Sequence, residues 1–172
     1  MTDTPPTGHD GPYPAPVEVG GRRVAPEWID YNGHMNVGYY GIAFDQALDV
    51  VLSDHLGIGV EFVKAAGQGP YVVQSHLHFL AELLEGARFA VRFRLLDHDA
   101  KRLHLFASMV ADATGATCAT QEVMVMNVDH GSGRPAPYPG WALRRFARMR
   151  ADHAGLPAAV QIGAPLGIRR DR

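Results

Sequence analysis

Residues 37–56 hold the longest apolar helical pattern in this sequence, and that pattern limits what the chain can fold into. It predicts a helix from about Val37 to His55, because Asn36 is suited to cap its start and Gly57 to end it. A helix that is apolar over most of its surface has to be buried, so the rest of the chain must wrap around it. The apolar residues at helical spacing are Val37, Tyr40, Phe44, Ala47, Leu48, Val51, Leu52 and Leu56.

After residue 70 the pattern changes from helical to alternating, which is typical of strands. Short polar turns separate the strands and favour an antiparallel meander. A further short strand is expected at 17–24, with a turn at Gly20-Gly21, and a last helix runs from Pro139 to near Gly155. The sequence therefore predicts an α+β domain in which a sheet curves around one helix. The expected meander strands are 71–83, 87–96, 102–111 and 117–128.

Length and composition indicate a single globular domain without a nucleic-acid-binding face. The chain has 172 residues, 47% of them apolar, and a formal net charge of −2. We expect a flexible segment at 1–16, the folded domain at 17–155, with a loop at 59–70, and a tail at 156–172. No apolar run approaches the roughly 18 residues of a membrane span, and the first residues lack the basic and apolar regions of a signal peptide. These features predict a cytoplasmic protein with no membrane partner.

The turn that precedes the helix carries most of the polar chemistry, in the run Asp30-Tyr31-Asn32-Gly33-His34-Met35-Asn36. A helix N-terminus has free N–H donors and partial positive charge, so it suits a polarised or anionic oxygen. A carboxylate beside such donors can attack a carbonyl or activate water while the amides polarise the oxygen. The structural alternative is that Asp30 only caps the turn.

This run, with Tyr39-Tyr40 and the helix that follows, resembles the hotdog-fold acyl-CoA thioesterases of the 4-hydroxybenzoyl-CoA thioesterase type. Two later segments extend the similarity over about residues 22–140: Gln74–Glu82 (QSHLHFLAE) and Lys101–His104 (KRLH). Together with the D-Y-N-G-H run, they are most similar to the betainyl-CoA thioesterase branch. One departure is Asn32, which stands where the best-known pattern has a second acidic residue.

The resemblance implies a hotdog fold, a long central helix wrapped by a five-stranded antiparallel sheet, and a homodimer or homotetramer with active sites between protomers. It implies that Asp30 is the nucleophile or general base and that the Val37 and Gly38 amides polarise the carbonyl, without metal or organic cofactor. A related branch places the carboxylate on the central helix, where Asp45 and Asp49 are alternatives. Further site residues are Asn32 and His34 for catalysis and Trp28, Tyr31, Asn36, Tyr39, Tyr40 and His76 for substrate binding.

Each of these side chains also has a simpler explanation. Asn36 is most simply a helix cap, and Gly33 is most simply a position that needs positive φ. The aromatic residues are most simply core or interface groups, although these aromatic residues could instead form a cage for a trimethylammonium group. His76 and His78 alternate along a strand, which alone is a weak signal for metal binding, and we expect no metal site.

The expected reaction is hydrolysis of a small acyl-CoA, with betainyl-CoA as the candidate substrate, to a free acid and CoA. Two alternatives stay open. One is a hotdog-fold enoyl-CoA hydratase or dehydratase, which generally needs a histidine–carboxylate pair. The other is a module that binds acyl-CoA or a quaternary amine without turnover.

Overall fold

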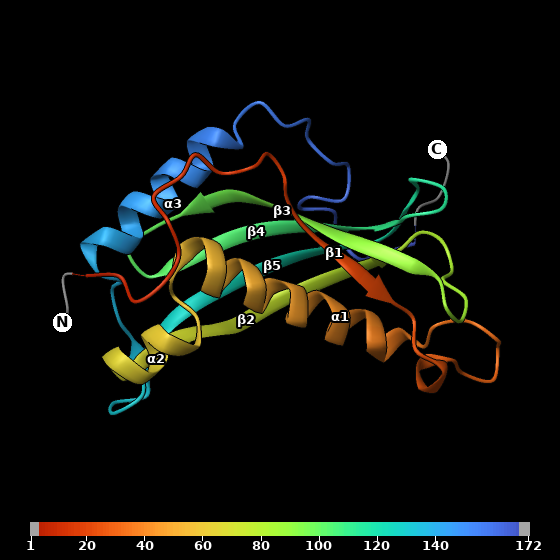
Figure 1. Ribbon diagram of the computed structural model, residues 1–172, viewed down its shortest axis with the longest axis horizontal. Helices are drawn as coiled ribbons and strands as arrows, with labels where there is room; N and C mark the ends of the chain where they lie inside the picture. Colours follow the sequence, from red (N-terminus) through yellow and green to blue (C-terminus); the bar gives the residue numbers. More distant parts are fainter. Residues whose placement is uncertain (1–3, 169–172) are drawn as a thin grey trace.

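A computed structural model describes residues 4–168 of the chain (Figure 1). An antiparallel sheet curls around the long helix α1, and a second long helix, α3, packs at one end of the sheet. The predicted arrangement of a helix wrapped by a sheet is therefore confirmed. In chain order the elements are β1 (Val17–Arg23), a 3₁₀ turn (Pro26–Trp28), α1 (Val37–Val50), a π-helical turn (Val51–Leu56), α2 (Val60–Ala66), β2 (Gln68–Phe79), β3 (Arg88–His98), β4 (Arg102–Ala111), β5 (Thr117–Asp129), β6 (Arg134–Pro135) and α3 (Gly140–Asp152).

The strand order is β1-β3-β4-β5-β2, with the two-residue β6 paired to the end of β5. The predicted meander of four strands is therefore wrong in the position of its first strand. β3, β4 and β5 are neighbours in the sheet in chain order, but β2 pairs with β5 instead of β3. The free edge of β3 is taken by β1, whose Val17 pairs with Phe93. Residues 80–87 carry the chain from β2, at one edge of the sheet, to β3, which lies next to the opposite edge strand β1.

The inner face of α1 fills the concave side of the sheet. Phe44 is fully buried, and burying such a ring contributes about 1.5–3 kcal/mol. Ala43 and Ala47 are also fully buried, and their small side chains let the helix backbone approach the strands closely. The buried sheet residues that face them alternate along each strand, as the sequence pattern predicted, and include Val91, Phe93, Leu103, Leu105, Ala107, Val123 and Val125.

Three local features differ from the sequence prediction. The expected loop at 59–70 contains the short helix α2, bounded by Gly59 and by Gly67, which adopts positive φ. β2 starts at Gln68 and ends at Phe79, so residues 80–83 lie outside the strand. The Gly20-Gly21 pair does not turn the chain: β1 continues through a bulge between Val19 and Arg22, where Gly21 has a φ of +75°.

The segment expected to be loosely attached, residues 1–16, makes specific contacts where it is described. Tyr13 is buried, and its backbone N–H donates to the Asp152 carboxylate at 2.8 Å. Arg145 of α3 is only 4% exposed, and its guanidinium donates to the Thr7 carbonyl at 2.6 Å, the Leu56 carbonyl at 3.1 Å and an Asp10 oxygen at 2.8 Å. Arg145 therefore ties this segment and the end of the central helix to α3.

The tail crosses the outer face of the sheet, opposite α1. The Gly163 N–H donates to a carboxylate oxygen of Glu122 at 2.7 Å, and Arg94 donates to the Pro157 carbonyl. Residues 156–168 thus touch β3 and β5, while the expected boundary of the folded domain lies at residue 155.

We predict that Arg145→Met lowers the free energy of unfolding by about 2–3 kcal/mol, because the buried Leu56 carbonyl and the part-buried Thr7 carbonyl lose their donor. Chemical denaturation with equal protein concentrations measures this change. The control is Arg144→Met on the exposed face of the same helix, which should change the free energy by less than about 0.5 kcal/mol. Equal losses for the two variants would contradict the assigned role of Arg145.

Candidate active site

Backbone hydrogen bonds hold the polar turn before α1 in place, both across the turn and to a distant segment. Its two flanks meet in a β-bridge between Ile29 and Met35, and the Asp30 N–H donates to the His34 carbonyl at 3.1 Å. The Met35 N–H donates at 2.8 Å to the carbonyl of Leu83, which belongs to the connection after β2. Gly33 has a φ of +83°, as its place in the turn predicted. The turn is therefore locked to a segment nearly fifty residues away in the sequence.

The Asp30 carboxylate is half-buried and hydrogen-bonded at both oxygens. One oxygen accepts the backbone N–H of Asn32 at 2.8 Å, and the other accepts the side-chain amide of Asn36 at 3.3 Å. Such bonds hold an ionised carboxylate in one orientation. The Asn32 side chain makes no hydrogen bond within residues 4–168; its backbone alone contacts Asp30.

Asn36 connects this carboxylate to the helix. Its side-chain oxygen accepts the Gly38 N–H at 3.0 Å, which makes it the N-cap of α1, as expected. The same amide donates its N–H to Asp30. Because Gly38 is occupied by the cap, only one of the two expected amides is available: within residues 4–168 the Val37 N–H has no hydrogen-bond partner.

A cavity of about 540 Å³ opens beside the turn. One wall is the turn itself, which includes the predicted residues Asp30, Tyr31, Asn32, His34, Asn36 and Val37 together with Tyr40 of α1. The other wall is the end of β2 and the connection that follows it: Phe79, Leu80, Ala81 and Glu82.

This second wall was not identified as part of the site from the sequence. The alternating pattern predicts a strand that extends to residue 83, and only the presence of Leu80, Ala81 and Glu82 in the QSHLHFLAE segment of the resemblance connects them with the Asp30 turn. Tyr40 packs edge-on against Phe79, with ring centroids 5.2 Å apart, and burial raises the pKa of the Tyr40 hydroxyl. Each wall of the cavity therefore carries an aromatic ring and a carboxylate: Tyr40 and Asp30 on one wall, Phe79 and Glu82 on the other.

The predicted aromatic residues do not form a single cage. Trp28 and Tyr39 stack on each other at 5.3 Å but lie outside the residues that line the cavity. Tyr31 is 97% exposed at the cavity rim, and Tyr40 lines the interior. Within one chain, Tyr40 and Phe79 are the aromatic rings placed to meet a substrate.

His76 lies in a different cavity, of about 530 Å³, between the outer face of the sheet and the tail. There His104 and Glu122 approach to 2.7 Å, and the His76 ring lies 4.4 Å from that of His78. No group of three or more metal-ligating side chains is arranged for a metal ion anywhere in residues 4–168. In the same part of the chain, no helix is long and apolar enough to cross a membrane.

The two carboxylates of α1 that the sequence offers as alternatives, Asp45 and Asp49, lie outside both of these cavities. Asp45 lines a hollow of about 400 Å³ with Gly38, Gly41, Val72 and Gln121, apart from the Asp30 cavity. Asp49 lies one turn further along the helix, and its pKa is raised by burial and by the charge of Asp45. Neither residue shares the hydrogen-bond network of Asp30.

A curled antiparallel sheet around one helix is the hotdog fold, and the carboxylate at the helix start suits thioester hydrolysis. The chain belongs to the thioesterase-like superfamily, whose family model matches residues 24–146. This membership confirms the fold and the enzyme class expected from the sequence resemblance.

Individual relatives support the same assignment. The chain is 36% identical to the betainyl-CoA thioesterase of Pseudomonas aeruginosa, over 84% of this chain and 91% of that protein. It is 37% identical to an L-carnitine dehydrogenase/betainyl-CoA thioesterase of Agrobacterium fabrum, over 74% of this chain but only 27% of that longer protein.

Solved structures agree with the fold. A Staphylococcus aureus protein in complex with CoA superposes with a TM-score of 0.83 at 25% identity, over 90% of this chain and 96% of that one. A 1,4-dihydroxy-2-naphthoyl-CoA thioesterase from Synechocystis gives 0.63 at 15% identity, over 82% and 96% of the two chains, and shows the fold alone.

We predict that Asn36→Ala lowers the free energy of unfolding by about 1 kcal/mol, because α1 loses its cap. Thermal or chemical denaturation measures the change. Asn32→Ala is the matched control, since its side chain makes no hydrogen bond within the described chain and should leave stability within about 0.5 kcal/mol. If Asn36→Ala left the free energy of unfolding unchanged, the cap would not be what holds the helix start.

Proposed function

We propose that this acyl-CoA thioesterase acts in the cytoplasm on a small cationic acyl-CoA, with betainyl-CoA as the leading substrate, and releases betaine and CoA. The observation that carries the mechanism is the Asp30 carboxylate, hydrogen-bonded at both oxygens, in a cavity also lined by Val37, whose N–H has no partner within residues 4–168. The 36% identity to a betainyl-CoA thioesterase over 84% of the chain supports the substrate.

In the proposed reaction the carbonyl oxygen of the thioester accepts the Val37 N–H at the positive end of α1. Charge builds on this oxygen during attack, and one such donor is typically worth about 10²–10³ in rate. The thiolate is a good leaving group, so the C–S bond breaks without a dedicated acid.

Asp30 acts in one of two ways. As a nucleophile it forms a mixed anhydride with the acyl group, which water then hydrolyses to regenerate the carboxylate. As a general base it removes a proton from water, whose oxygen attacks the carbonyl carbon directly. In both routes Asn36 holds the carboxylate against the helix start, and His34 and Asn32 provide the polar side of the cavity where water enters.

Hydratase chemistry has a weaker basis. The histidine–carboxylate pair that it generally needs has a counterpart in His104 and Glu122, 2.7 Å apart. That pair lies in the cavity under the tail and shares none of the residues that line the Asp30 cavity. Incubation with an enoyl-CoA, followed by its ultraviolet absorbance, tests for hydration directly.

We predict that Asp30→Asn lowers kcat for thioester cleavage by at least about 10³-fold, because the amide neither attacks nor accepts a proton. Release of free thiol from betainyl-CoA measures the rate. Asp45→Asn, which changes an α1 carboxylate in a separate hollow, is the matched control and should retain activity within a few-fold. If the two variants behaved in the opposite way, the helix carboxylate would be the catalytic one. A wild type that binds acyl-CoA without releasing thiol would favour the non-catalytic alternative.

We further propose that the protein forms a homodimer through the free edge of β2. This strand has twelve residues, lies at the edge of the sheet and exposes apolar side chains, among them Tyr71 and Val73, each 51% exposed. Long apolar edges of this kind pair with another strand. A two-fold axis beside β2 would join the two sheets and bring the partner toward the exposed Val37 and Ile42 of α1.

We predict that Val73→Lys converts the dimer to a monomer, because a charged side chain on an edge strand opposes pairing. Light scattering during gel filtration should give twice the chain mass of 18.7 kDa for the wild type and the single chain mass for the variant. Val160→Lys, at an apolar position 84% exposed in the tail, is the control and should stay dimeric. A monomeric wild type would refute the proposed interface.

A further inference from the structure

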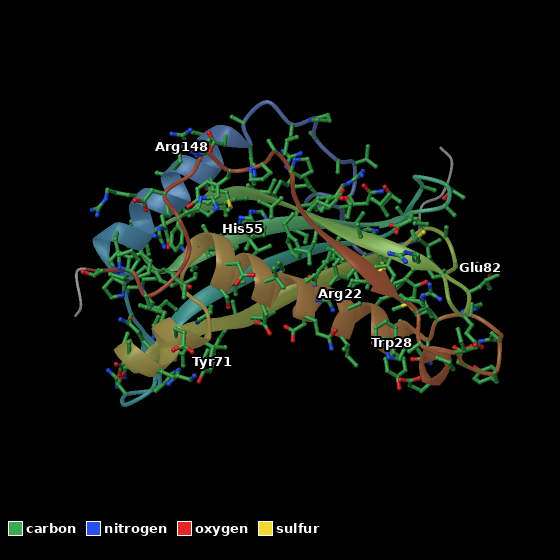
Figure 2. The ribbon with its side chains drawn as sticks, in the orientation of Figure 1. Arg22, Trp28, His55, Tyr71, Glu82 and Arg148 are labelled. Carbon is green, nitrogen blue, oxygen red and sulfur yellow. The ribbon has the colours of Figure 1, made fainter. Side chains whose placement is uncertain are left out.

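Glu82 is a carboxylate on the cavity wall that the hydrolysis itself does not use. It lies in the connection after β2, on the wall that faces the Asp30 turn, and it is exposed. Figure 2 shows Glu82 and Trp28 at the same end of the molecule, where α1 begins, and Tyr71 near the opposite end of β2. Within residues 4–168 the Glu82 carboxylate has no hydrogen-bond or ion-pair partner, whereas both oxygens of Asp30 are engaged.

The lining of this cavity holds carboxylates but no lysine or arginine. Asp30 and Glu82 are its two acidic side chains, and His34 is the one basic side chain among the lining residues. The charge of Glu82 reaches the Tyr40 hydroxyl, whose pKa is raised mainly by burial and to a smaller extent by this carboxylate. Glu82 therefore lies near the Tyr40 ring across the cavity, and beside Phe79 on its own wall.

The dimensions of a betainyl group restrict where its counter-charge can be. The quaternary nitrogen is two bonds from the carbonyl carbon, or about 2.5 Å for bonds of about 1.5 Å. A carbonyl bound at the Val37 amide thus keeps its cation inside the same cavity. Asp45 is eight residues further along α1, about 12 Å along the helix axis at about 1.5 Å per residue, and lies in another hollow.

We infer that Glu82 is a specificity-determining residue that supplies the counter-charge for a quaternary ammonium on the acyl group, with Tyr40 and Phe79 as the aromatic surface beside it. A trimethylammonium group has no N–H to donate, so it is recognised by negative charge and aromatic faces. This inference rests on the proposed function. It assigns Glu82 to binding and leaves the attack on the carbonyl to Asp30.

The test compares two substrates of nearly equal shape. In 3,3-dimethylbutyryl-CoA a carbon atom replaces the quaternary nitrogen of betainyl-CoA, so the two differ in charge but little in volume. The wild type should show the higher kcat/KM for betainyl-CoA. Glu82→Gln should lower kcat/KM for betainyl-CoA by about tenfold, largely through KM, because the cation is present equally in ground and transition states. It should leave the neutral substrate within about twofold.

Glu85→Gln is the matched control: it removes an exposed carboxylate three residues away that does not line the cavity, and both substrates should keep their wild-type kinetics. The inference is overturned if Glu82→Gln keeps the preference for the charged substrate, or if it slows both substrates equally, which would indicate a structural role. A wild type that cleaves other acyl-CoAs but not betainyl-CoA would refute the proposed substrate, a distinct result that also removes the basis of this inference.

Discussion

The burial of α1 in the curled sheet is the constraint on which the rest of this molecule depends. The fully buried Phe44 and the alanines beside it fix the helix axis against the strands, and the helix start is thereby fixed as well. The position of the helix start in turn places three groups: the Val37 N–H, the Asn36 cap and the Asp30 carboxylate that the cap contacts. The proposed active site lies at a helix terminus and is therefore as rigid as the core that anchors the helix, which suits a reaction that needs a hydrogen-bond donor and a carboxylate in fixed relation.

The parts of the fold that the sequence predicted are those whose signal is local. Helical spacing located α1, and alternation located β3, β4 and β5 to within a few residues. Strand order could not be predicted in this way, because it depends on which edges remain free, and β1 occupies the edge of β3 that a meander would have given to β2. The helix α2 was missed because it has only seven residues, too few for a clear period.

The same division applies to the site. The turn from Asp30 to Asn36 was recognisable because its polar residues are consecutive and precede a helix. The opposite wall, which includes Glu82, comes from a distant segment and meets the turn through tertiary packing, in part the bond from the Met35 N–H to the Leu83 carbonyl. The sequence also could not distinguish the two amides at the helix start, because their availability depends on which of them the Asn36 oxygen accepts.

The double contact made by Asn36 restricts the chemistry of that position to one functional group. Serine, threonine, aspartate and asparagine all serve as helix caps, and an aspartate differs from asparagine by one oxygen in place of one nitrogen. An aspartate there would still accept the Gly38 N–H, yet it would set a second negative charge against Asp30 where the asparagine now donates a hydrogen bond. Either aspartate or asparagine at position 36 would cap the helix, whereas only the asparagine amide can donate a hydrogen bond to the Asp30 carboxylate. A helix cap is usually among the more interchangeable features of a protein, but here the charge of the neighbouring Asp30 favours asparagine over aspartate.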